Sequence, residues 1–144
     1  MKGRKAMLTT ITPQTNRILI ADDDPIIRHL VATVVKQLGY IPVTVGDGRE
    51  ACHLMKVDAD FKAAILDMSM PYLEGIELIR YMRTEKRLKR IPVMLITAEP
   101  DIRLLSDSFS AGATVFLHKP FTPEQLQAAL RMLLGTRSST RRAA

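Results

Sequence analysis

The chain has 144 residues, of which 47% are hydrophobic and 25% are charged, and it carries a formal net charge of +6. This length fits one domain with a sizeable core, and this composition excludes a chain that is disordered throughout. The apolar runs fall short of the roughly 18–20 residues that cross a bilayer, and the lone Cys52 excludes an internal disulfide. We therefore expect a cytoplasmic protein without membrane insertion.

The excess of positive charge lies at the two ends of the chain. Residues 1–16 and 136–144 contain basic but no acidic residues, whereas residues 17–135 hold 15 basic and 15 acidic residues. A neutral central region argues against specific nucleic-acid binding. We expect residues 1–16 to form a disordered basic tail, and residues 136–144 to form a second disordered tail or the start of a linker.

Residues 17–135 alternate between short apolar runs and amphipathic stretches. We expect five strands, at residues 17–21, 41–45, 62–68, 91–98 and 113–119. We expect five helices: from Pro25 to a stop at Gly39, from near Asp47, after Gly75 within residues 76–90, from about residue 100 to a stop at Gly112, and over residues 123–134 with a stop at Gly135. Continuously apolar strands that alternate with helices are typical of an α/β fold with a doubly wound parallel sheet.

Polar side chains follow the ends of these predicted strands. Asp22 and Asp23 come directly after the first strand, and Asp67, Thr97 and Lys119 lie at the ends of the third, fourth and fifth. The carboxyl ends of parallel strands form the ligand-binding edge of a doubly wound sheet. The five residues are therefore expected to meet in one crevice. Asp24 is expected to cap the first helix instead.

This set of residues suits phosphoryl transfer. Converging carboxylates repel one another unless a cation joins them, and carboxylate oxygens suit Mg²⁺. An Asp carboxylate can act as a nucleophile that becomes an aspartyl-phosphate, while a Lys ammonium and a Thr hydroxyl can stabilise the phosphoryl oxygens. The sequence thus predicts an Mg²⁺-dependent phosphoacceptor site.

Four segments resemble the signature blocks of response-regulator receiver domains (CheY-like) of two-component signalling. They are RILIADDDPIIRHLV, AAILDMSMPYLEGIEL, VMLITA and AGATVFLHKPF, in the order and spacing of that family. The resemblance covers residues 17–135. It implies a flavodoxin-like (βα)5 fold with the strand order 2-1-3-4-5, and a signalling domain that assists its own phosphorylation and dephosphorylation and is not an enzyme.

The resemblance also implies a role for each site residue. Asp67 would be the phosphoacceptor, Asp22, Asp23 and Asp67 would hold Mg²⁺ with the backbone carbonyl of Ser69, and Lys119 and Thr97 would contact the phosphoryl group. Phe116 would be the aromatic switch residue that responds to Thr97. A cis peptide would join Lys119 to Pro120, and Glu99 and Ser69 would tune the lifetime of the phosphoryl group.

Partners follow from the same resemblance. A histidine kinase or a histidine phosphotransfer protein would donate the phosphoryl group, and a downstream protein would bind the face built from the fourth helix, fifth strand and fifth helix. Only ten residues follow Leu134, too few for an output domain, so we expect a stand-alone receiver. Homodimerisation that depends on phosphorylation stays open.

Two other functions compete with this prediction. One is a receiver-like interaction module that works without phosphorylation. The other is a phosphatase of the haloacid-dehalogenase type. The run Asp22-Asp23-Asp24 is similar to the Asp-x-Asp motif of those enzymes, although that scheme leaves Asp67 without a role. A separate basic run at residues 80–90 is interpreted as a solvated helix end, with a docking patch for an acidic partner as the alternative.

Overall fold

A computed structural model describes residues 15–98 and 102–143, apart from the side chains of residues 102, 104 and 136–143. The strands are β2 (Arg17–Ala21), β3 (Ile41–Val45), β4 (Ala63–Asp67), β5 (Val93–Thr97) and β6 (Val115–His118). The helices are α2 (Pro25–Gln37), α3 (Gly48–Val57), α4 (Gly75–Thr84), α5 (Ile102–Ala111) and α6 (Pro123–Ala143).

The five strands form one parallel sheet in the order β3-β2-β4-β5-β6. This is the predicted 2-1-3-4-5 arrangement, so the predicted fold class is confirmed. Every residue of β4 and β5 is buried, because these inner strands are covered on both faces. The carboxyl ends of β2 and β4, where the sheet order reverses, lie side by side.

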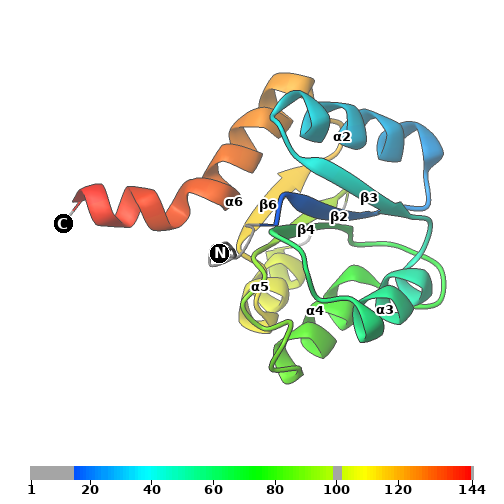
Figure 1. Ribbon diagram of the computed structural model, residues 1–144. Coiled ribbons are helices and arrows are strands. Elements are labelled where there is room, and N and C mark those ends of the chain that lie inside the picture. Colours follow the sequence, from blue (N-terminus) through cyan, green and yellow to red (C-terminus); the bar gives the residue numbers. More distant parts are fainter. Residues whose placement is uncertain (1–14, 99–101, 144) are drawn as a thin grey trace, which may run out of the picture.

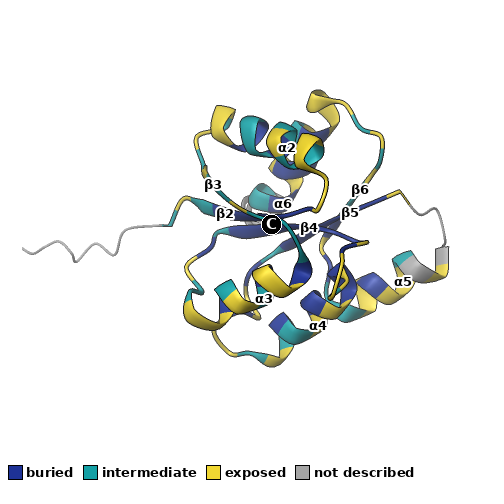
Figure 2. Cartoon of the chain, turned by 90° about the vertical axis from the view of Figure 1, so that its right-hand side faces the viewer, coloured by how far each residue is buried: buried dark blue, intermediate teal, exposed yellow. Residues whose placement is uncertain are grey.

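Two hydrophobic cores hold the helices against the sheet. On one face, α2 and α6 pack through residues such as Val31 and Leu130, and on the other face α3, α4 and α5 cover side chains such as Leu19 and Leu95. Strands β2, β4 and β5 are largely dark in Figure 2, whereas the outer faces of the helices are largely exposed. This sandwich leaves the loops at the carboxyl edge of the sheet free to carry polar groups.

Most helix boundaries follow the predicted capping residues. Asp24 caps α2 and Asp47 caps α3 through their carboxylates, and Gly39 and Gly112 adopt φ values of 93° and 120° directly after α2 and α5. The predicted cis peptide joins Lys119 to Pro120.

The expected end of the last helix at Gly135 is wrong, because α6 continues to Ala143. Residues 136–143, expected to form a disordered tail or the start of a linker, are therefore helical. Gly135 has no positive φ, and a glycine inside a helix costs only about 1 kcal/mol relative to alanine, which the flanking residues can offset. Residues 1–14 of the expected tail, which spans residues 1–16, lie outside the described residues. The Asn16 carbonyl accepts a hydrogen bond from the Ile41 amide at 2.8 Å.

The described part of the chain contains no helix that is both long and apolar enough to cross a membrane.

Candidate functional site

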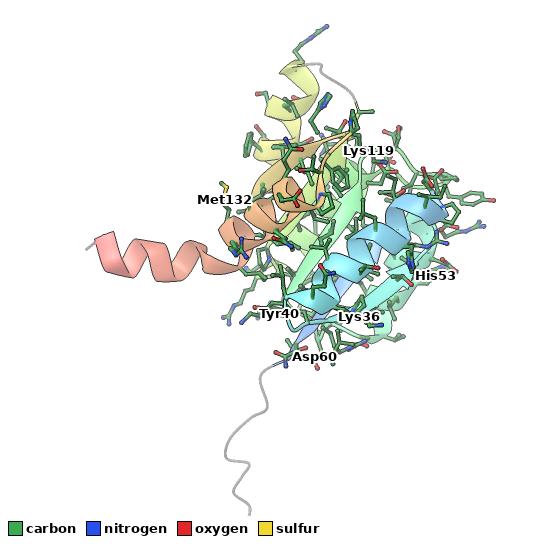
Figure 3. All side chains as sticks on the ribbon, turned by 90° about the horizontal axis from the view of Figure 1, so that it is seen from above. Lys36, Tyr40, His53, Asp60, Lys119 and Met132 are labelled. Carbon is green, nitrogen blue, oxygen red and sulfur yellow. The ribbon has the colours of Figure 1, made fainter. Side chains whose placement is uncertain are left out.

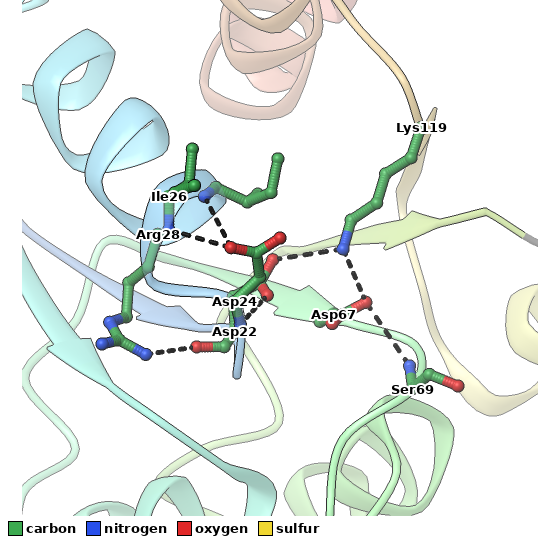
Figure 4. A network of polar contacts seen from close by, with 8 residues as sticks. Asp22, Asp24, Ile26, Arg28, Asp67, Ser69 and Lys119 are labelled. Atoms are coloured by element: carbon green, nitrogen blue, oxygen red, sulfur yellow. Dashed lines mark hydrogen bonds and ion pairs between the residues drawn. The ribbon is translucent and has the colours of Figure 1, made fainter.

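The carboxylate of Asp67 lies at the centre of the predicted crevice. Asp67 is the last residue of the buried strand β4, and only 5% of its surface is exposed. The Lys119 ammonium lies 3.4 Å from Asp67 Oδ1 and 3.4 Å from Asp22 Oδ2 (Figure 4). Three of the predicted residues, from the carboxyl ends of three different strands, therefore meet at one point of the sheet edge.

Asp22, Asp23 and Asp67 form a cluster in which one carboxylate oxygen of each residue lies within 4.8 Å of the others. Asp22 and Asp67 are buried, whereas Asp23 is exposed. Asp22 Oδ1 accepts a hydrogen bond from the Asp24 amide at 2.9 Å. Asp22 Oδ2 is buried and accepts no hydrogen bond from the described residues; its contact with Lys119 is an ion pair at 3.4 Å without hydrogen-bond geometry.

Such a buried oxygen without a hydrogen-bond partner is costly unless a cation or a water completes its surroundings. The Asp22 carboxylate belongs to the acidic cluster, and its Oδ2 lies 3.4 Å from the Lys119 ammonium. Hard oxygen ligands of this kind fit a divalent cation such as Mg²⁺. The cluster can therefore hold a metal ion.

The pKa of Asp67 reflects the same crowding. Burial and then the neighbouring Asp22 carboxylate raise it from 3.8 to about 7, although Lys119 and the Ser69 amide act in the opposite direction. The Ser69 amide donates a hydrogen bond to Asp67 Oδ1 at 3.4 Å. In the absence of a cation the crevice thus disfavours the ionised Asp67, and a cation would favour it.

The turn between β2 and α2 sets the orientation of Asp22. Asp24 Oδ1 accepts hydrogen bonds from the Ile26 and Ile27 amides at 2.9 and 3.5 Å, as predicted for a helix cap. The Arg28 guanidinium donates to the Asp22 carbonyl at 2.7 Å (Figure 4). Sequence reasoning missed Arg28, although its position on the first turns of the helix after the acidic run was a signal that it could reach back.

The loop after Asp67 packs against the site backbone with almost no space. The Gly75 amide donates to the Met68 carbonyl at 3.0 Å, and a Cβ on Gly75 would lie 2.5 Å from the Asp67 carbonyl oxygen. Tyr72 adopts a φ of 72°, which is rare for an aromatic residue, and its ring lies 4.0 Å from the Arg49 guanidinium carbon. The loop is therefore held by close packing and by a cation–π contact.

Thr97 ends β5 at the same edge and is 3% exposed. It pairs in register with His118, and the Lys119 amide donates to the Thr97 carbonyl at 2.8 Å. The backbone of the β5 end is thus tied directly to Lys119. The expected roles of the Thr97 hydroxyl and the Ser69 carbonyl stay predictions, and Glu99 lies outside the described residues.

Phe116, the expected switch residue, is half-buried on β6. Its ring meets the ring of Phe109 on α5 at a centroid distance of 4.6 Å and an interplanar angle of 76°. Phe109 itself is 56% exposed. This edge-to-face pair, which sequence reasoning missed, connects β6 to the surface of α5.

Comparisons with known proteins agree with the geometry. The family model of the response regulator receiver domain matches residues 18–131. The chain is 33% identical over 121 residues to the chemotaxis protein CheY1 of Helicobacter pylori, covering 83% of this chain and 98% of that protein. It is 32% identical to the chemotaxis protein CheY-3 of Vibrio cholerae over 124 residues, covering 85% of this chain and 95% of that protein.

Solved structures give the same result. The chemotaxis response regulator CheY4 of Vibrio cholerae superimposes with a TM-score of 0.77 at 32% identity, covering 83% of this chain and 99% of that chain. The receiver domain of a sensor histidine kinase of Pseudomonas aeruginosa PAO1, which has a magnesium ion in its active-site cleft, superimposes with a TM-score of 0.74 at 26% identity. It covers 84% of this chain and 98% of that chain.

Proposed function

The chain belongs to the response regulator receiver domain family of two-component signalling, and from this we propose that Asp67 accepts a phosphoryl group from a phosphorylated histidine of a partner protein. The observation that carries the proposal is the buried Asp67 carboxylate, which lies 3.4 Å from Lys119 inside a cluster of three carboxylates. The proposed receiver domain spans residues 17–135.

In the proposed reaction, an Asp67 carboxylate oxygen attacks the phosphorus of the phosphohistidine. A P–O bond to Asp67 forms while the P–N bond to the imidazole breaks, and the leaving nitrogen takes a proton from solvent. The Lys119 ammonium can stabilise the negative charge that the phosphoryl group brings, because it already lies 3.4 Å from Asp67 Oδ1. Burial of Asp67 keeps competing water away from the attacking oxygen.

We assign the metal of this site as Mg²⁺, held by Asp22, Asp23 and Asp67 with the carbonyl of Ser69. When bound, the ion would neutralise charge on the transferring phosphoryl group. The unpartnered Asp22 Oδ2 and the magnesium in the cleft of the Pseudomonas receiver domain support this assignment. Arg28 positions Asp22 through its backbone carbonyl and does not touch the reacting atoms.

The proposed output is a shift between two packed states, in which the Thr97 hydroxyl turns to the phosphoryl group and Phe116 moves inward. The affected face consists of α5, β6 and α6, and Phe109 and Met132 are large exposed apolar side chains on these helices among the described residues. We propose that the phosphodonor is a histidine kinase or a histidine phosphotransfer protein, and that a downstream protein binds this face.

Acetyl phosphate, a small phosphodonor, tests the proposal with intact-mass measurement. The wild type should gain one phosphoryl group only with Mg²⁺, Asp67→Asn should gain none, and Lys119→Ala should still be labelled but fail to switch. Each variant should keep the far-ultraviolet circular dichroism of the wild type. Persistent labelling of Asp67→Asn would reassign the acceptor. A wild type that accepts from neither acetyl phosphate nor a histidine-phosphorylated donor would favour the phosphorylation-independent module.

A further inference from the structure

Four exposed cations converge on the turn between α4 and β5. Lys86, Arg87, Lys89 and Arg90 line an open hollow of about 500 Å³. Between them, the side chain of Leu88 is completely buried and anchors the turn to the core. The Leu88 and Lys89 amides both donate to the Glu85 carbonyl, at 3.0 and 2.9 Å, so the turn has a defined backbone. We call residues 86–90 the basic turn.

Two arginines fix the basic turn to the rest of the fold. Arg83 donates to the carbonyls of Lys89, Ile91 and Gly112 at 2.9, 3.0 and 2.7 Å. Arg87 donates to the carbonyls of Met55 and Lys56, at the end of α3, at 3.4 and 3.2 Å. The cations are therefore presented from a rigid base, which lowers the entropic cost of binding a partner.

The charges of the basic turn are not balanced within the described residues. None of the four lining side chains has a carboxylate of a described residue within 4.0 Å, unlike Arg17 and Lys119, which both form ion pairs. Like charges held close together repel, and an anionic partner would remove that repulsion. The arrangement thus favours an anion at the hollow.

The lining of the hollow distinguishes between classes of anion. The Leu88, Lys89 and Ile91 amides donate to the Glu85 and Leu88 carbonyls, so these three amides are not available to a phosphate cradle. Recognition of bases uses aromatic stacking, and none of the lining residues is aromatic. Lysine and arginine side chains remain, and these pair with carboxylates at protein interfaces.

We infer that the basic turn is a docking surface for a segment of a partner protein rich in Asp and Glu. The turn precedes β5, whereas Asp67 ends the parallel neighbour β4, so the two sites lie at opposite edges of the sheet. Figure 3 labels Lys119 at one edge of the sheet and Asp60, which precedes β4, at the other. An acidic segment can therefore bind while the phosphoacceptor site is in use.

The test uses fluorescence anisotropy with a fluorescein-labelled peptide of alternating Glu and Ser at low salt. Lys89→Ala/Arg90→Ala should weaken binding by about tenfold, because two exposed ion pairs are lost. The matched control Lys36→Ala/Arg131→Ala removes the same charge from exposed positions on α2 and α6 and should change affinity by less than about twofold. Thermal melts check that both variants fold.

Three results would overturn the inference. An equal loss in the two variants would mean that net charge alone attracts the peptide. No binding of the peptide by the wild type at low salt would exclude the docking surface. Tighter binding of inorganic triphosphate or of a single-stranded oligonucleotide than of the peptide, lost in Lys89→Ala/Arg90→Ala, would assign the hollow to phosphate-bearing ligands.

Discussion

The guanidinium of Arg49 stacks on the ring of Tyr72 at 4.0 Å and so joins the start of α3 to the loop that follows Asp67. Tyr72 holds a φ of 72° and is 70% exposed, so few other contacts fix its backbone. A close approach supports the same junction, because a Cβ on Gly48 would collide with the Leu73 carbonyl. The shape of the loop after Asp67 therefore depends partly on a residue of α3.

This contact predicts a measurable coupling. Arg49→Ala should lower the free energy of unfolding by about 0.5–1 kcal/mol in the presence of Tyr72, the usual worth of an exposed cation–π contact. It should lower it by much less when Tyr72 is replaced by Asn, which tolerates positive φ without a ring. Urea unfolding of the four proteins gives the coupling as a double-mutant cycle. Additive effects would show that the stacking contributes nothing.

The pKa of Asp67 predicts an unusual pH dependence of stability. Because its value rises from 3.8 to about 7 on folding, the folded protein binds this proton more tightly than the unfolded chain. The resulting stabilisation is complete below about pH 4 and is lost as the pH rises through about 7. Asp67→Asn does not titrate, so its stability relative to the wild type should increase from pH 5 to pH 8.

Urea unfolding in the presence of EDTA measures this difference. Asp107→Asn, on an exposed position of α5, is the control and should show no such trend. Added Mg²⁺ should reverse the effect by stabilising the wild type more at pH 8 than at pH 5, since the ion binds the ionised carboxylate. A stability difference between Asp67→Asn and wild type that is the same at both pH values would contradict the raised pKa.

The edge-to-face pair of Phe109 and Phe116 predicts a shift in the switch equilibrium. Such a pair is worth about 0.5–1.5 kcal/mol beyond its buried area, so Phe109→Ala should change the population ratio of the Phe116 conformers by about 2- to 12-fold. Fluorine NMR of fluorophenylalanine-labelled protein, with and without phosphorylation, reports this ratio. The conservative variant Phe109→Tyr should leave it unchanged. If the ratio of the Phe116 conformers is the same in Phe109→Ala as in the wild type, the ring pair does not influence the proposed switch.

Gly75→Ala should destabilise the protein by about 1–3 kcal/mol, the usual cost of overpacking. The added methyl group would meet the Asp67 carbonyl at 2.5 Å and Leu95 at 2.8 Å, and the backbone carbonyl cannot move without displacing the phosphoacceptor. Thermal unfolding measures the loss. Gly135→Ala, where nothing lies within 4 Å of the added group, should be neutral or stabilising. Equal effects at the two glycines would contradict the packing argument.

The location of the residues at the carboxyl edge of the sheet was predictable, because a single rule on parallel strands places all of them. Parallel strands bring their ends together, so Asp22, Asp67 and Lys119 had to meet once the five strands were located. The haloacid-dehalogenase alternative was also testable by position: Asp24, its second motif residue, uses its carboxylate to cap α2.

Contacts that depend on side-chain direction were not predictable. Arg28 reaches back to a backbone carbonyl, and Phe109 reaches across to β6, and neither contact leaves a periodic trace in the sequence. The continuation of α6 past Gly135 was missed for a different reason. A glycine ends a helix when it adopts a positive φ, and whether it does so depends on the conformation of the residues after it.

The burial of Asp22 and Asp67 in one crevice means that selection for stability and selection for function favour different residues at these positions. Without a cation, burial and the neighbouring Asp22 disfavour the ionised Asp67, and one Asp22 oxygen has no hydrogen-bond partner among the described residues. A random-mutagenesis screen that selects only for heat resistance should therefore recover neutral replacements at these positions early. Such variants would keep the architecture and lose the proposed phosphoryl acceptance. Any effort to raise the thermal stability of this protein must therefore select for both properties at once.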